Sequence, residues 1–221
     1  MKKLIMVFTI FCCILSVSFP VCAQEQLERQ EPLKEPLQGK AAAFAHIEEA
    51  VSTIHAVMSE FRQERRLAML KEPLVSTGRF YYEKPDKLRW EFINPDPSGF
   101  VVNGKTAKQW KGKGNLPETF DLRQNPVIGL IVDQIMAWTK ADFAWIEKRY
   151  TVSVVKENPI ILQLVPRSSQ EKKYIDHISV FFEADTHYAN AVEIIEREGD
   201  STHITFFNMI VNISPQKELF E

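Results

Sequence analysis

The sequence predicts an α+β fold in which helices cover one long antiparallel sheet. Runs typical of β-strands, separated by turn signals at short and even intervals, fill most of the chain after residue 75. Two segments have helical periodicity, one ahead of these runs and one among them. Strands grouped together, with helices set apart from them, are typical of α+β proteins rather than of alternating α/β folds.

The first helix is predicted from Lys40. Apolar side chains recur every three or four residues, at Phe44, Ile47, Val51, Ile54, Met58 and Phe61, which is one face of a helix. Periodicity alone would carry this helix to Phe61.

Strand patterns follow at residues 76–83, 87–93, 99–102, 106–111, 150–156, 160–165, 178–184, 191–197 and 202–212. In the second of these, Leu88, Trp90 and Phe92 alternate with charged residues, which is the period of two of a half-buried strand. The pair Asn103-Gly104 is a strong hairpin signal. The even spacing of the runs favours an antiparallel meander.

A second helix is predicted to begin at Pro126, with Asn125 as its cap, and to run to about Lys140. Apolar residues leave it little polar face: Val127, Ile128, Leu130, Ile131, Val132, Ile135, Met136 and Trp138. A helix that is apolar nearly all round must be covered on most sides, and this one is too short to span a membrane.

The N-terminus has the pattern of a secretory signal peptide over residues 1–23. Two lysines precede an apolar run, and Val21-Cys22-Ala23 fits a cleavage site before Gln24. An uncleaved anchor is the alternative. Residues 24–39 are polar and interrupted by proline, which predicts a flexible arm or a docking peptide, and residues 40–221 then form a single domain.

Cleavage would remove all three cysteines, Cys12, Cys13 and Cys22, so the mature chain would have neither disulfides nor thiol chemistry. Its 25 basic and 29 acidic side chains give a formal charge of −4. Without a basic cluster, the composition argues against nucleic acid as a partner.

Motifs of catalysis are missing from the sequence. It has no G-x-S-x-G, no H-E-x-x-H and no phosphate-binding glycine loop. Asp185-Thr186-His187 resembles a fragment of a metal site, but it lies in a predicted turn with no second histidine nearby, which equally fits a solvated turn. We therefore expect no enzyme activity, no cofactor and no metal, while a hydrolase with dispersed catalytic groups stays an alternative.

Three motifs, in order, resemble the LolA family of periplasmic outer-membrane lipoprotein carriers. "EFRQ" at residues 60–63 is similar to the family's Phe-x-Gln. "GRFYYEKPDKLRW" has Gly78, Pro85 and Trp90 in register with a family motif, and "INPDPSGFVVNGKTAKQW" resembles the hairpin that follows it. The resemblance covers residues 44–111, and beyond them it depends on element order and length.

The resemblance implies that Phe-x-Gln lies in the first strand. We therefore end the first helix near His55 and expect Ser59, Phe61, Gln63 and Arg65 to share one face of a strand. The implied fold is a strongly curved antiparallel sheet, an unclosed β-barrel, whose mouth is covered by lid helices around an apolar cavity for acyl chains. The candidate cavity residues are Phe61, Phe80, Tyr82, Leu88, Trp90, Phe92, Ile131, Ile135 and Trp138; the alternative for each aromatic residue is ordinary core.

One position departs from the family pattern. Members commonly have an arginine before the motif proline that hydrogen-bonds to the lid, and this chain has Lys84 there. Lysine lacks the planar fork of donors of arginine, so the exchange is not conservative at a bidentate site. Lys84 is a candidate lid latch, or else a solvated lysine at a strand end.

The implied function is that of a monomeric, non-enzymatic periplasmic carrier. It would take acylated lipoproteins or another lipid, such as a glycolipid, from an inner-membrane extraction complex and pass them to an outer-membrane acceptor. An acyl chain with about 15 methylenes exposed to water costs on the order of 12 kcal/mol, so such cargo needs shelter. The alternative is a regulatory sensor of the same fold that binds lipid or lipoprotein and a protein partner.

Overall fold

A computed structural model describes residues 37–112, 117–122 and 126–221. The helices of these residues are α2 (Leu37–Ser52), α3 (Pro126–Thr139) and α4 (Phe143–Arg149), with short 3-10 helices η2 (Glu171–Lys173) and η3 (Lys217–Phe220). The strands are β1 (Ala56–Arg66), β2 (Leu74–Glu83), β3 (Lys87–Asn94), β4 (Ser98–Asn103), β5 (Thr106–Lys111), β6 (Glu118–Asp121), β7 (Tyr150–Glu157), β8 (Ile160–Pro166), β9 (Ile175–Phe182), β10 (Ala189–Glu196) and β11 (Ser201–Val211).

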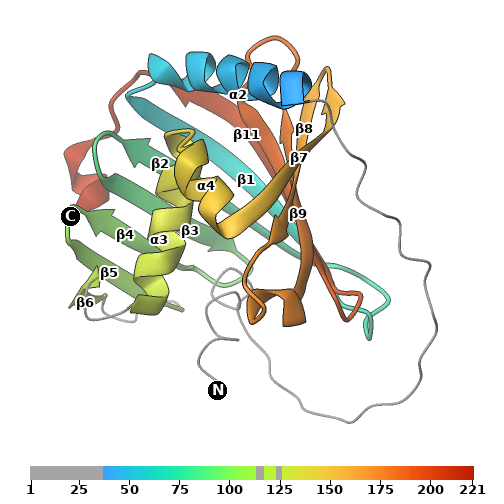
Figure 1. The fold of residues 1–221 in the computed structure, drawn as a ribbon. Helices are drawn as coiled ribbons and strands as arrows, with labels where there is room; N and C mark the ends of the chain where they lie inside the picture. The colour runs from blue at the N-terminus through green and yellow to red at the C-terminus, as the bar shows by residue number, and fades with distance from the viewer. Residues whose placement is uncertain (1–36, 113–116, 123–125) are drawn as a thin grey trace.

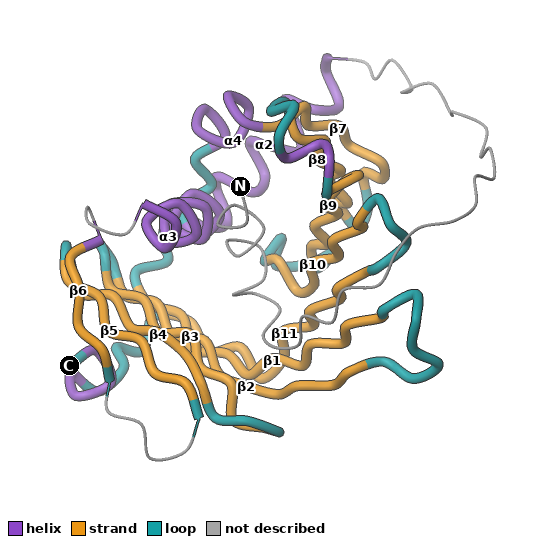
Figure 2. Tube along the Cα trace, turned by 90° about the horizontal axis from the view of Figure 1, so that it is seen from below, coloured by secondary structure: helices purple, strands orange, loops and turns teal. Residues whose placement is uncertain are grey.

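These eleven strands form one antiparallel sheet in the order β6-β5-β4-β3-β2-β1-β11-β10-β9-β8-β7. The first and last strands pair in the middle of the sheet, so β6 and β7 are its two edges although they are neighbours in sequence. The chain must therefore cross from one edge to the other between them, and α3 and α4 lie in this crossing. Figure 2 shows the strongly curved sheet, with the helices between its two edges.

The predicted fold class, an unclosed barrel of α+β type, is confirmed. The early end of the first helix is also confirmed, because α2 ends at Ser52 and β1 begins at Ala56. Ser59, Phe61 and Gln63 are buried on one face of β1, as an alternating strand requires. The helix begins at Leu37, three residues before the predicted start, so residues 37–39 belong to α2 and not to the arm.

One strand and one α-helix were not predicted, nor were the two short 3-10 helices. Strand β6 has four residues, and α4 has seven, so neither is long enough to give a periodic signal. Helix α4 still has a recognisable start, because the Asp142 carboxylate accepts a hydrogen bond from the backbone N–H of Trp145 at 2.9 Å. Its Phe143 and Ile146 are buried against the sheet.

Buried apolar residues form two clusters. One joins α2, α4 and the end of α3 to strands β7 to β10, and the other joins α3 to strands β1 to β5 and β11. Helix α2 lies along one end of the curved sheet (Figure 1). In the described part of the chain, no helix combines the length and the apolar character that crossing a bilayer demands.

The predicted signal peptide of residues 1–23 and the arm of residues 24–36 lie outside the described residues.

Candidate functional site: an apolar cavity under the helices

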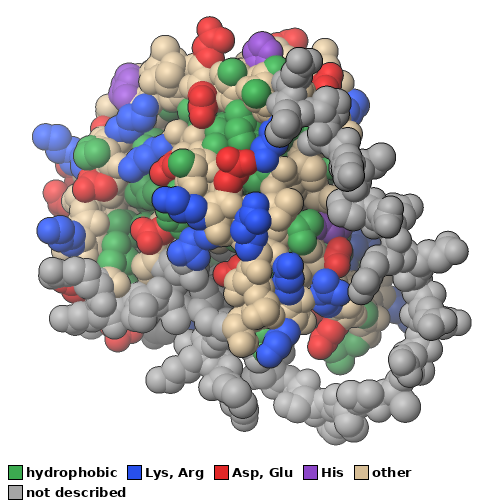
Figure 3. Space-filling view, in the orientation of Figure 1, with side chains coloured by type: hydrophobic (Ala, Val, Ile, Leu, Met, Phe, Trp, Pro, Cys, Tyr) green, Lys and Arg blue, Asp and Glu red, His purple; other side chains and the backbone are tan. Residues whose placement is uncertain are grey.

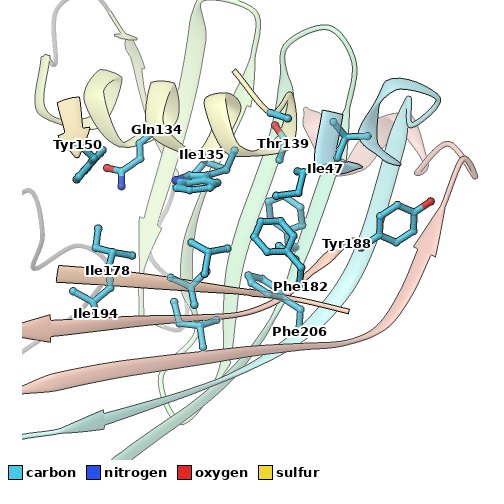
Figure 4. A pocket seen from close by; sticks show the side chains of 18 of the residues that line it. Ile47, Gln134, Ile135, Thr139, Tyr150, Ile178, Phe182, Tyr188, Ile194 and Phe206 are labelled. Carbon is cyan, nitrogen blue, oxygen red and sulfur yellow. The ribbon is translucent and has the colours of Figure 1, made fainter. Parts of the chain in front are cut away.

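A cavity of about 470 Å³ lies between the two apolar clusters. Its walls come from α2, α3, α4 and both halves of the sheet, and Figure 4 shows side chains from the helices and from opposite strands pointing into it. Most of the lining is aliphatic or aromatic. The volume is in the range of sites for small organic ligands, about 300–1,000 Å³.

Aromatic rings from β2, β3 and β11 form the sheet side of the cavity, with β1 between β2 and β11. The ring of Trp90 meets Phe80 edge-on at 5.6 Å and Phe206 at 6.0 Å between centroids, and all three line the cavity. Phe61 lies 4.5 Å from Trp90 but is fully buried behind it. Strand alternation places these rings on the helix-facing side, and edge-to-face contacts then hold them in place.

Helix α3 forms the opposite side. Its Gln134, Ile135, Trp138 and Thr139 line the cavity, while Val132 is buried against the sheet. This position accounts for the near-total apolarity of the helix, since one face packs on the core and another faces the cavity. The side chain of Ile131 lies outside the described residues.

Of the nine predicted cavity residues, four line the cavity: Phe80, Trp90, Ile135 and Trp138. That they contact lipid stays a prediction. Phe61, Tyr82 and Leu88 are instead wholly inside the second apolar cluster, and Phe92 packs at its margin, so their assignment to the cavity is corrected. The reason is that α3 closes onto this part of the sheet, and the space between them is filled by side chains. Burial raises the pKa of the Tyr82 phenol above its ordinary value.

Several lining residues were missed by the sequence reasoning. They lie in β9 and β10 and include Ile178, Val180, Phe182 and Ile194. The period-two pattern of Ile178, Val180 and Phe182 predicts one buried face, but it does not distinguish a cavity wall from solid core.

Lys84 is exposed, and its Nζ lies 3.5 Å from the carbonyl oxygen of Ser52 in the last turn of α2. This contact is to α2, one of the helices that cover the cavity. A cation beside the C-terminus of a helix is favourable, although a bond of this length is weak. A latch role for Lys84 stays a prediction, now directed at α2.

The candidate metal fragment at Asp185 and His187 has one further histidine beside it. His187 stacks on His46 with ring centroids 5.3 Å apart. Within residues 37–112, 117–122 and 126–221, no three His, Cys, Asp or Glu side chains are grouped so as to hold a metal ion.

Comparison with known proteins agrees with this architecture. The family model described as "Outer membrane lipoprotein carrier protein LolA" matches residues 51–221. The outer-membrane lipoprotein carrier protein of Methylococcus capsulatus is 22% identical over 186 residues, which cover 83% of this chain and 85% of that protein.

The solved structures that this chain is similar to have low sequence identity. An uncharacterized conserved protein from Thermus thermophilus matches with a TM-score of 0.53 and 9% identity, over 83% of this chain and 93% of its own. A chain of the Pseudomonas aeruginosa MucA/MucB complex matches with a TM-score of 0.49 and 15% identity; the match covers 82% of this chain but 60% of that one. Because the family model covers well over half of the sequence and the open barrel with its lid helices is present, the chain belongs to the LolA family of outer membrane lipoprotein carrier proteins.

Proposed function

We infer that the protein is a periplasmic, non-enzymatic carrier that shelters the acyl chains of lipoproteins, or of a related lipid, and moves them from the inner to the outer membrane. The observation that carries this inference is the apolar cavity between the sheet and the helices. Each methylene moved from water into such a cavity contributes about 0.8 kcal/mol, which offsets the cost of taking an acyl chain out of a membrane.

The architecture is also compatible with release of a bound lipid from the cavity. Helix α3 belongs to the crossing between the two sheet edges and is not one of the strands of the sheet. A covering element attached through side-chain packing can move without breaking the ladder of strands. An inner-membrane extraction complex as donor and an outer-membrane acceptor complete the proposed cycle.

Replacement of Ile135 by Asp tests the cavity. The carboxylate would face an apolar space and carry a large desolvation cost, so uptake of a fluorescent fatty acid should fall at least about tenfold. Val155→Asp makes the same chemical change at a side chain that is 60% exposed and should bind normally. Circular dichroism checks that both variants are folded. Equal uptake by the two variants would refute a ligand site beneath α3.

A regulatory sensor of the same fold is the alternative, and it makes a different prediction. A carrier removes lipid from donor vesicles and delivers it to acceptor vesicles, whereas a sensor binds a protein partner with an affinity that changes with lipid. Mass spectrometry of lipid extracted from the native protein would identify the cargo class. Chemical turnover of that lipid would instead indicate a hydrolase.

A further inference from the structure

One end of the cavity is polar. Six side chains with hydrogen-bonding groups line it: Gln134, Arg149, Tyr150, Ser168, Gln170 and Glu171. They come from α3, from the junction of α4 with β7, and from the segment between β8 and β9. Figure 4 shows Gln134 and Tyr150 together at this end, with Tyr188 at the other. We call these six residues the polar end.

Hydrogen bonds to backbone carbonyl groups hold the segments of the polar end together. The N–H of Arg167 donates to the carbonyl oxygen of Arg149 at 2.7 Å, and its Nε donates to the carbonyl oxygen of Tyr150 at 3.1 Å. On the next segment, the N–H of Lys172 donates to the carbonyl oxygen of Ser168 at 3.0 Å. Side chains distant in sequence are thus placed on fixed backbone, which a ligand subsite needs.

Two residues of the polar end, Arg149 and Glu171, carry opposite charges. The Arg149 guanidinium lies over the Trp145 ring, with its central carbon 4.5 Å from the ring centroid, which is a cation–π contact. Among the described residues, no carboxylate lies within 4.0 Å of that guanidinium. Burial raises the pKa of Glu171, and the charge of Arg149 partly offsets the rise. The two groups attract each other without closing into an ion pair.

We propose that the polar end is a headgroup subsite that takes a zwitterionic phosphate–ammonium headgroup, with the phosphate on Arg149 and the ammonium on Glu171. The inference rests on the proposed function, because the acyl chain of the same lipid would fill the apolar part of the cavity. Arginine offers a planar fork that matches phosphate oxygens. Gln134, Ser168 and Gln170 supply neutral hydrogen-bonding groups around it.

Charge balance selects this headgroup over two others. An anionic headgroup would pair with Arg149 but repel the Glu171 carboxylate. An uncharged headgroup would desolvate both charged side chains without offering either of them an ionic partner, which costs free energy at a partly buried site. Lys and Arg side chains also gather on the face around α4 (Figure 3), and they would attract the phosphate during entry.

The test uses three single-chain lipids with the same acyl group, each below its critical micelle concentration: lysophosphatidylethanolamine, the monoacylglycerol phosphate and the uncharged monoacylglycerol. Affinities are measured by isothermal titration calorimetry for the native protein, Arg149→Gln and Glu171→Gln. The controls are Lys148→Gln and Glu48→Gln, which remove exposed charges.

Each variant at the polar end should lower the affinity for the zwitterionic lipid at least about tenfold. Arg149→Gln should also lower the affinity for the anionic lipid, whereas Glu171→Gln should raise it. Neither variant should lower the affinity for the uncharged lipid. Binding of that lipid also shows that the variants are folded.

The outcomes separate the two proposals. If the native protein binds none of the three lipids, the carrier function fails. If it binds the uncharged lipid but Glu171→Gln leaves the zwitterionic affinity unchanged or raised, the headgroup subsite is refuted while the acyl site stands.

Discussion

Phe44 on α2 and Phe143 on α4 stack face to face, with ring centroids 3.8 Å apart and planes inclined by 3°. The two residues are far apart in sequence, and Phe143 lines the cavity. This pair joins the N-terminal helix to the crossing between the two edges of the sheet. It therefore connects two of the helices that cover the cavity.

Phe44→Ala should loosen this cover. Loss of the half-buried ring and its stacking should lower the free energy of unfolding by about 1–3 kcal/mol. Bound fatty acid should also leave faster. Urea denaturation and stopped-flow transfer to acceptor vesicles measure the two effects. Glu48→Ala, at an exposed position of the same helix, is the control, and identical behaviour of the two variants would show that the stack does not hold the cover.

Gly78 should not tolerate a side chain. A Cβ at this position would overlap with the carbonyl oxygen of Glu91 and with the ring of Phe61. Phe61 is the residue of β1 that pairs with Gly78. Gly78→Ala should therefore destabilise the protein by about 2 kcal/mol or more, through strain in a packed sheet. Thermal denaturation measures the loss. The neighbouring Arg79→Ala removes only a solvent-exposed ion pair with Glu60 and should change stability little; a Gly78→Ala protein as stable as this control would contradict the steric argument.

Lys84 should set the rate of lipid release if its contact with Ser52 holds α2 against β2. Lys84→Ala would remove a contact worth about 0.3–1 kcal/mol, and Lys84→Arg would offer two donors to the last carbonyl groups of the helix. Release to acceptor vesicles should then be fastest in the Ala variant and slowest in the Arg variant. Equal rates for all three proteins would identify Lys84 as surface charge.

Cleavage is expected between Ala23 and Gln24. The Val-x-Ala sequence before this bond is the type of site that signal peptidase cuts. Intact-mass analysis of protein from the periplasmic fraction should give a chain that begins at Gln24. A retained leader, or a diacylglycerol on Cys22, would mean that the protein is held at a membrane.

Local sequence was sufficient for most elements and for the family. Alternation at Leu88, Trp90 and Phe92 predicted the strand and its buried face, and Asn103-Gly104 predicted the hairpin, because these signals depend on neighbours a few residues apart. Elements of four and seven residues, β6 and α4, were missed because they contain too few repeats to show a period.

The division between cavity and core was decided by tertiary structure. Leu88 and Trp90 share one face of β3, yet Leu88 is fully enclosed by packing and Trp90 lines the cavity. A period of two determines which face a side chain is on, but the distance from that face to the covering helix depends on the curvature of the sheet and the path of α3. The polar end has the same origin. Gln134 and Arg149 lie in the crossing between the sheet edges and Glu171 lies between β8 and β9, so only the folded chain places all three at one cavity.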